Sequence, residues 1–274
     1  MGVRLKLLPF NNVVATGLAT LDLSNLMGWT IERMTFQLGG GAFTKAMITG
    51  IQLKANGKVI WDSSGSRRDS AMQYRGITAS ASFLTLDFSE IRSKTETGQS
   101  LGAIDTTAGI LNLKLEVSIA GATTPTLQGY AECSRPQIDQ ASSPYRGMIA
   151  KVHSSTITIG AAGTFSLAVP HLSPQDGGSV FKRINFFSAN MTGLTIKKNG
   201  VVIEESIKAL NDYQQQEYRK VPQAGLYVYD PIVDDNQSQC LNTRDAQTME
   251  VLGTFSAGET ITIEVEVLEP LGAF

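Results

Sequence analysis

The sequence contains very little histidine and cysteine. Its 274 residues include only two of each: His153 and His171, and Cys133 and Cys240. A metal enzyme would need several imidazole ligands per site, and a Ser-His-Asp triad would have to use one of these two histidines. Because both lie in the second half and have no counterpart in the first, we expect them to be surface or structural residues. Two cysteines without a secretion signal predict buried thiols rather than a disulfide.

Neither positive charge nor hydrophobicity is concentrated anywhere in the chain. The formal net charge is −2 and 18% of the residues are charged, so the basic field that nucleic-acid binding relies on is missing, and we expect no direct contact with nucleic acid. No apolar run approaches the roughly 20 residues of a transmembrane helix. Residues 1–10 are too few for a signal peptide, and we therefore expect a protein made and folded in a cytoplasm.

What the sequence does contain is a duplication. The segment Thr49–Ile60 reappears as Thr192–Ile203, with seven identities in twelve positions at an offset of 143. A period this long indicates two whole domains, because solenoid repeats span about 20–50 residues. Further pairs of segments match in the same order at offsets between 143 and 150: Ala19–Leu23 with Gly163–Leu167, Glu32–Phe36 with Lys182–Phe186, and Leu115–Ile119 with Ile263–Val267.

Two glycine- or proline-containing stretches mark the organisation of the copies. The offset drops from 150 to 143 across Gly39–Lys45, which we interpret as an insertion at a hairpin tip of the first copy. It lacks the ending of a phosphate-binding loop. Between the copies, Ser134–Tyr145 holds two prolines and few aliphatic residues, which is typical of a linker or long loop. We therefore predict a first domain with its linker over residues 1–145 and a second domain over residues 146–274.

Each copy shows the pattern of an all-β domain. Apolar and polar residues alternate over Leu113–Ile119 and over Ile261–Val267, which places one side of each strand in a core. Asn-Gly pairs at positions 56–57 and 199–200 each separate two apolar runs, and they predict type I′ hairpins because both central residues of that turn need a positive φ. A short helical pattern follows each hairpin: Ser66–Tyr74 in the first copy and Ile207–Tyr218 in the second.

The acidic residues offer one candidate for a bound ion. Asp230, Asp234 and Asp235 lie close together in the sequence and could supply oxygen ligands to Ca²⁺, which takes six to eight of them. Their spacing matches no calcium-binding loop, so we prefer a solvated loop, and a structural calcium ion is the alternative. No catalytic residue, cofactor-binding residue or other metal ligand is predicted. The residues themselves therefore indicate a structural protein rather than an enzyme.

The second copy carries the clearest resemblance to a known family. Its hairpin is followed in order by these segments: Asn211–Tyr213, Tyr218, Leu226–Tyr229, Leu241–Leu252, Gly258–Val267 and the terminal Phe274. In this order and length the chain resembles the double jelly-roll major capsid proteins of tailless, icosahedral, membrane-containing bacteriophages, and within them the corticoviruses.

This resemblance implies an architecture and a set of partners. It implies two tandem eight-stranded jelly rolls per chain and a homotrimer with a pseudo-hexagonal outline, located in the virion. The implied partners are neighbouring capsid trimers, minor capsid and penton proteins, and proteins of an internal membrane around a double-stranded DNA genome. The segment Met1–Phe10, with Arg4 and Lys6, is expected either to face that membrane or to pack as an arm against a neighbouring subunit.

Two other classes of function stay open. A tandem β-sandwich that binds carbohydrate or a receptor would need exposed aromatic residues in a groove, and only 7% of the residues are aromatic. A double jelly-roll enzyme would need carboxylates that converge between its two sandwiches. Asp87, Asp105 and Asp230 are the residues whose substitution would test that possibility first.

Overall fold

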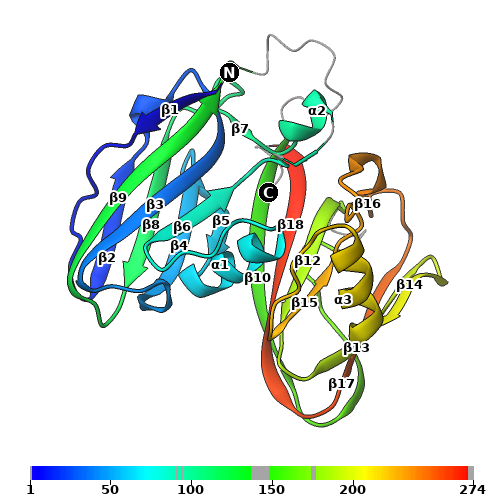
Figure 1. Ribbon diagram of the computed structural model, residues 1–274. Helices are drawn as coiled ribbons and strands as arrows, with labels where there is room; N and C mark the ends of the chain where they lie inside the picture. The colour runs from blue at the N-terminus through cyan, green and yellow to red at the C-terminus, as the bar shows by residue number, and fades with distance from the viewer. Residues whose placement is uncertain (1, 91, 94, 137–147, 174–176, 271–274) are drawn as a thin grey trace. The chain divides into compact units, whose positions relative to one another are not determined.

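The computed structural model describes residues 2–90, 92–93, 95–136, 148–173 and 177–270, and it divides the chain into two compact units (Figure 1). The first unit comprises Met1–Gln73, Ile77–Lys151 and Glu269–Phe274, and the second comprises Tyr74–Gly76 and Val152–Leu268. The boundary that we predict at residue 145 falls within residues 137–147, outside the described residues, so it stays a prediction.

The strands of the first unit form two sheets, of five and four strands. One has the order β1-β9-β3-β6, with the short strand β7 pairing to β3, and the other has the order β5-β4-β8-β2. The strands are β1 (Val3–Lys6), β2 (Gly17–Asp22), β3 (Thr30–Ala42), β4 (Ile48–Ala55), β5 (Lys58–Ser63), β6 (Phe83–Asp87), β7 (Ile104–Asp105), β8 (Leu113–Ile119) and β9 (Thr123–Ser134). The helices are α1 (Gly65–Tyr74) and α2 (Glu96–Gln99), with 3₁₀ turns at Ser24–Leu26 and Lys45–Met47.

The second unit repeats this plan. Its sheets have the orders β15-β12-β18-β10, with β16 pairing to β12, and β11-β17-β13-β14. The strands are β10 (Met148–Ile159), β11 (Gly163–Ser166), β12 (Val180–Phe187), β13 (Met191–Lys198), β14 (Val201–Ile207), β15 (Leu226–Tyr229), β16 (Leu241–Asn242), β17 (Met249–Phe255) and β18 (Glu259–Pro270). The helix α3 spans Lys208–Glu217, and a 3₁₀ turn spans Gln237–Gln239.

The two units correspond element by element. Strands β1 to β9 take the same places in the sheets of the first unit as β10 to β18 take in the second, and α1 corresponds to α3. The prediction of two tandem eight-stranded jelly rolls, each with a short helix after its Asn-Gly hairpin, is therefore confirmed. Among the described residues, no helix is long and apolar enough to cross a membrane.

The Asn-Gly hairpins form as predicted and also fix a neighbouring loop. Asn56 and Asn199 have φ angles of 51° and 52°, and the glycine after each also has a positive φ. The side-chain oxygen of Asn199 accepts hydrogen bonds from the backbone N–H groups of Gln247 and Thr248, at 2.7 and 3.1 Å, just before β17. Asn56 makes the equivalent bonds before β8. Each asparagine thus holds both a turn and the approach to the next strand.

Two sequence interpretations are corrected. Leu115–Ile119 lies in β8, whose counterpart is β17, whereas Ile263–Val267 lies in β18, whose counterpart is β9. The match was wrong because any half-buried strand has the same period-two pattern. The stretch Gly39–Lys45 is not a hairpin tip, because its first residues extend β3 and pair with β9. A Cβ at Gly40 would lie 2.0 Å from the carbonyl oxygen of Thr124, so glycine permits this close approach.

The cores explain why the strands alternate. In the second unit, Phe181, Ile184 and Phe186 of β12 are fully buried, as are Ile263 and Val265 of β18. Burial of each such side chain contributes roughly 1.5–3 kcal/mol before the entropy of folding is subtracted. Figure 1 shows the strands of this unit wrapped into two layers, with α3 on the outside next to β14. The core fixes the strand register, and the register positions the polar groups described next.

Candidate functional site

The three aspartates for which the sequence favours a solvated loop, with calcium binding as the alternative, each have a protein partner. The carboxylate of Asp230 is buried and accepts hydrogen bonds from Arg183 Nε and from the hydroxyl of Tyr74, both at 3.0 Å. Asp234 accepts from a backbone N–H two residues later, and Asp235 accepts from Lys220 Nζ at 2.7 Å. These contacts assign the aspartates to an ion pair, a turn and a second ion pair. The structural calcium ion stays a prediction.

Arg183 is the centre of a buried ionic cluster in the second unit. It lies on β12 between two neighbouring strands, with Asp230 at the end of β15 and Glu266 of β18 on either side. Arg183 Nη1 is 3.5 Å from Glu266 Oε2, and the side chains of all three residues are at most 5% exposed. Burial and the charge of Asp230 raise the pKa of Tyr74 well above its ordinary value, so its hydroxyl stays a hydrogen-bond donor.

The first unit contains the same cluster. Arg33 of β3 lies 3.4 Å from Asp87 of β6 and 3.9 Å from Glu132 of β9. In both units the arginine comes directly after a β-bulge, between Ile31 and Arg33 in β3 and at the matching place in β12. A β-bulge bends its strand locally and thereby directs the arginine side chain toward the acids of the neighbouring strands. The two clusters differ in exposure, because the Arg33 side chain is 21% exposed and the Arg183 side chain is 1% exposed.

Sequence reasoning missed these clusters. It matched the segments that contain Arg33 and Arg183 but placed no acid beside them. The acids stand on other strands, where the spacing between the copies has changed, so no single offset aligns all three members. The sequence does contain one usable signal, because an acidic residue stands at the end of an apolar run in each copy: Asp87 in the first and Asp230 in the second.

The two histidines lie together, which the sequence did not predict. The rings of His153 and His171 stack with centroids 4.0 Å apart, and both side chains are partly buried. The surface or structural role expected for them stays a prediction. The cysteines carry thiols and no disulfide. The prediction of a buried thiol is confirmed for Cys133, whereas Cys240 is only partly buried.

The second unit exposes an apolar surface along β14 and α3, which we call the β14–α3 surface. Its exposed residues are Val201, Val202, Ile203, Ile207, Leu210, Tyr213, Tyr218 and Val221. Single exposed apolar side chains are ordinary, but their concentration on one strand and on the helix and loop after it is typical of an interaction surface. In the part of the chain that the structure describes, β14 is also the outermost strand of its sheet. A strand edge with unpaired backbone groups is a template for pairing.

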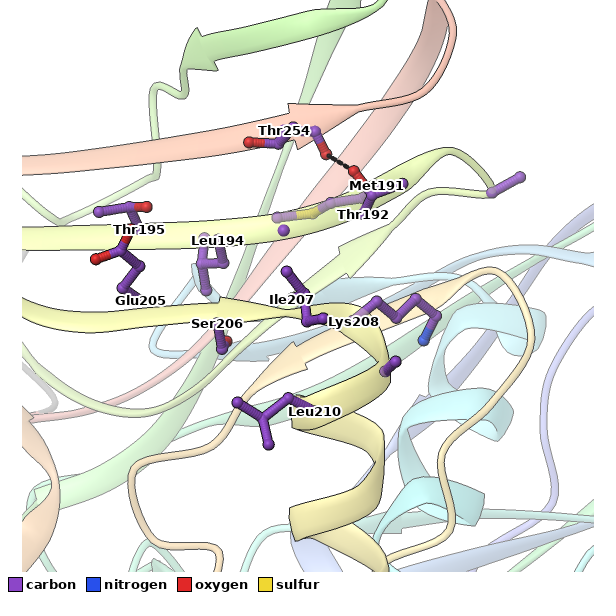
Figure 2. Close-up of a pocket in the computed structure, with 13 residues that line it drawn as sticks. Met191, Thr192, Leu194, Thr195, Glu205, Ser206, Ile207, Lys208, Leu210 and Thr254 are labelled. Atoms are coloured by element: carbon purple, nitrogen blue, oxygen red, sulfur yellow. Dashed lines mark hydrogen bonds between the residues drawn. The ribbon is translucent and has the colours of Figure 1, made fainter.

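A groove of about 770 Å³ opens at one end of this surface. Strand β13 forms its floor, with the side-chain hydroxyl of Thr192 donating to the backbone oxygen of Thr254 at 3.2 Å (Figure 2). The close-up shows Ile207 at the end of β14 and Leu210 at the start of α3 along the opposite side. Gly193 leaves the floor without a side chain. The groove is thus a shallow apolar recess rather than a cluster of reactive groups.

Comparison with known proteins identifies the family. Residues 4–134 match the model of the viral coat protein P2 N-terminal domain, and residues 149–271 match that of the C-terminal domain. No curated protein matches the sequence. The two matches together cover most of the chain, and they confirm the capsid-protein resemblance seen in its residues.

Solved structures share the fold over the full length. The major capsid protein P2 of bacteriophage PM2 has a TM-score of 0.84 at 18% identity, with 98% of this chain and 97% of that protein covered. The major capsid protein of Sulfolobus Turreted Icosahedral Virus has a TM-score of 0.73 at 13% identity, covering 99% and 97%. The Faustovirus major capsid protein has a TM-score of 0.63 at 7% identity, covering 98% and 90%. With both domain models matched in order, the chain belongs to the viral coat protein P2 family.

Proposed function

We propose that this coat protein is the major capsid protein of an icosahedral virion and forms homotrimers that tile its shell. The observation that carries the proposal is the repetition of one jelly roll down to its internal contacts. Both units have the same sheet orders, the same hairpin asparagine and the same arginine cluster.

The repetition supports a trimer for reasons of symmetry. Two similar units per chain give six similar units in a trimer, and these can surround an axis with an outline close to a hexagon. A hexagonal tile packs against six neighbours although only three chains are present, and the two units of each chain are free to differ where their contacts differ. A monomer would gain nothing from this arrangement.

The proposed role includes partners but no chemistry. We expect contacts with neighbouring trimers, with minor capsid and penton proteins, and with proteins of an internal membrane that encloses double-stranded DNA. We expect no hydrolytic or redox activity, because each of the two arginine clusters places its arginine between carboxylates of neighbouring strands. Such clusters hold strands in register rather than present reactive groups.

Light scattering on the purified chain, followed by negative-stain imaging, tests the proposal. With a chain mass of 29.4 kDa, a trimer has three times that mass, about 88 kDa, and its images should have a hexagonal outline. A monomer at micromolar concentration and moderate salt would refute the trimer. Glycan arrays would then test the carbohydrate-binding alternative.

A further inference from the structure

The equivalent hairpins of the two units have opposite environments. Val59 and Ile60 of β5 correspond to Val202 and Ile203 of β14 at the offset of 143. Ile60 is 0% exposed, whereas Ile203 is 42% exposed, and Ile207 at the end of β14 is 63% exposed. In the first unit Ile60 is fully buried and Val59 partly buried, whereas Val202 and Ile203 of the second unit are both exposed.

In the first unit, another segment covers the edge of β5. The first four residues of β10, Met148–Lys151, belong to this unit and are hydrogen-bonded next to β5. The indole N–H of Trp61 donates to the backbone oxygen of Ala150 at 2.7 Å, and both residues are buried. The start of β10 thus closes the edge that β14 leaves open in its own unit.

The repeat itself indicates what would cover β14. Strand β10 opens the second jelly roll, and its counterpart, which opens the first jelly roll, is β1. By the same relation, the segment that covers β14 is the one around β1, and in a homo-oligomer a second copy of the chain supplies it. We infer that the β14–α3 surface of one subunit binds the N-terminal segment of the next subunit, Gly2–Phe10.

The chemistry of the two surfaces agrees with this pairing. The N-terminal segment exposes the apolar side chains of Val3 (38%) and Leu8 (43%). It also exposes the basic residues Lys6 and Arg4, of which Arg4 lies 2.8 Å from Glu132 of its own unit. Strand β14 exposes apolar residues next to the acidic pair at positions 204 and 205. Burial of the apolar side chains then supplies affinity, and the opposite charges favour the pairing of these two different surfaces over the pairing of two like surfaces.

The contact is heterologous, because two different surfaces meet, and such a contact closes into a ring when the rotation permits. The inference rests on the proposed trimer and adds the surfaces that build it. It assigns Met1–Phe10 the role of an arm against a neighbour, one of the two roles that the sequence leaves open. Each surface can be altered by substitution without altering the other, because the two lie on different units.

Single substitutions test the surfaces. Ile203→Asp and Val3→Asp each add a charge to one side of the contact, and both should convert the trimer to smaller species in light scattering. Leu111→Asp is the matched control, because Leu111 is 89% exposed and lies on neither surface, and this variant should remain trimeric. Unchanged circular dichroism spectra would show that the variants fold, because loss of the trimer is itself expected to lower the melting temperature. Ile207→Asp gives a second substitution of β14 if Ile203→Asp does not fold.

Mixing the two variants tests the direction of the contact. The Ile203→Asp chain keeps an intact N-terminal segment, and the Val3→Asp chain keeps an intact β14–α3 surface. A mixture should form one productive contact and stop at two chains, about 59 kDa from twice 29.4 kDa, which chemical cross-linking would detect.

The possible failures are distinguishable. If the unsubstituted chain is not a trimer, the proposed function fails and the inference fails with it. If the unsubstituted chain is a trimer but Ile203→Asp and Ile207→Asp remain trimeric, only the inference is refuted. A mixture that forms no pair would refute the heterologous contact.

Discussion

Replacing Arg183 with methionine should destabilise the second unit severely. The substitution keeps the length of the side chain but removes the charge that lies between Asp230 and Glu266, whose side chains are 1% and 5% exposed. Removing one partner of a buried ion pair leaves the other charges buried without compensation, and it typically costs about 3–5 kcal/mol. Tyr74 still donates to Asp230, but a single neutral donor does not replace a guanidinium.

The repeat provides the control at the equivalent position. Arg33→Met removes the same group from the first unit, where the arginine side chain is 21% exposed and Glu132 is 27% exposed. Water screens the pair with Glu132 but not Asp87, whose side chain is 1% exposed and keeps two hydrogen bonds from Ser89. The expected loss is therefore smaller than in Arg183→Met, about 1–3 kcal/mol. Arg183→Lys, which keeps the charge but not the planar group, should lie between the two methionine variants.

Hydrogen exchange followed by mass spectrometry separates the two effects, because a two-domain chain does not unfold in a single step. In Arg183→Met, the amides of β12 and β18 should exchange more than a hundredfold faster, since 3 kcal/mol is about two factors of ten. The amides of β3 and β9 should change little in that variant. Equal effects of Arg183→Met and Arg33→Met, or unchanged exchange in Arg183→Met, would refute the assignment of stability to the buried cluster.

Three further outcomes are expected. Burial raises the pKa of Tyr227 to about 12 from its ordinary 10.0. The folded state therefore holds the phenol proton more tightly than the unfolded state does. The stabilisation by the protonated phenol is complete below pH about 10 and is lost as the pH rises toward 12. In urea denaturation, Tyr227→Phe should therefore lose less stability than the unsubstituted chain over that range, and parallel losses would contradict the reasoning. Burial also raises the pKa of Cys133 to about 12, so a thiol reagent near neutral pH should label Cys240 quickly and Cys133 only on unfolding; two equally fast thiols would show that Cys133 is accessible. Gly40→Ala should destabilise the chain by well over 1 kcal/mol, because its Cβ would lie 2.0 Å from a backbone oxygen. Gly57→Ala, at a similar positive φ but with nothing within 4 Å of its Cβ, should cost about 1 kcal/mol. Equal melting temperatures for the two glycine variants would contradict the steric argument.

The sequence was sufficient for features that depend on neighbouring residues. The hairpins at Asn56 and Asn199 were predictable because a positive φ at two successive positions restricts the residue types that can occupy them. The helices after them and the alternation of Leu113–Ile119 were predictable for the same local reason. The duplication then extended these assignments from one half to the other.

The sequence was insufficient where residues on different strands meet. The match of Leu115–Ile119 with Ile263–Val267 failed because alternation is common to all half-buried strands and does not identify one of them. The acids around Arg33 and Arg183 could not be located because loop lengths between the strands differ between the copies. Pairing across a sheet is set by register, and register is fixed by the whole core rather than by a segment.

The two equivalent hairpins differ in whether their outer strand is covered within the chain. Val59 and Ile60 are apolar because the edge of β5 is covered within its own unit. Val202 and Ile203 are equally apolar, although nearly half of each side chain is exposed. Exposed apolar side chains along a strand edge favour association with another chain, and in β14 they lie beside the acidic pair at positions 204 and 205. The apolar residues of β14 are therefore explained by a contact outside the single chain, which closes this edge in assembly as the start of β10 closes the edge of β5.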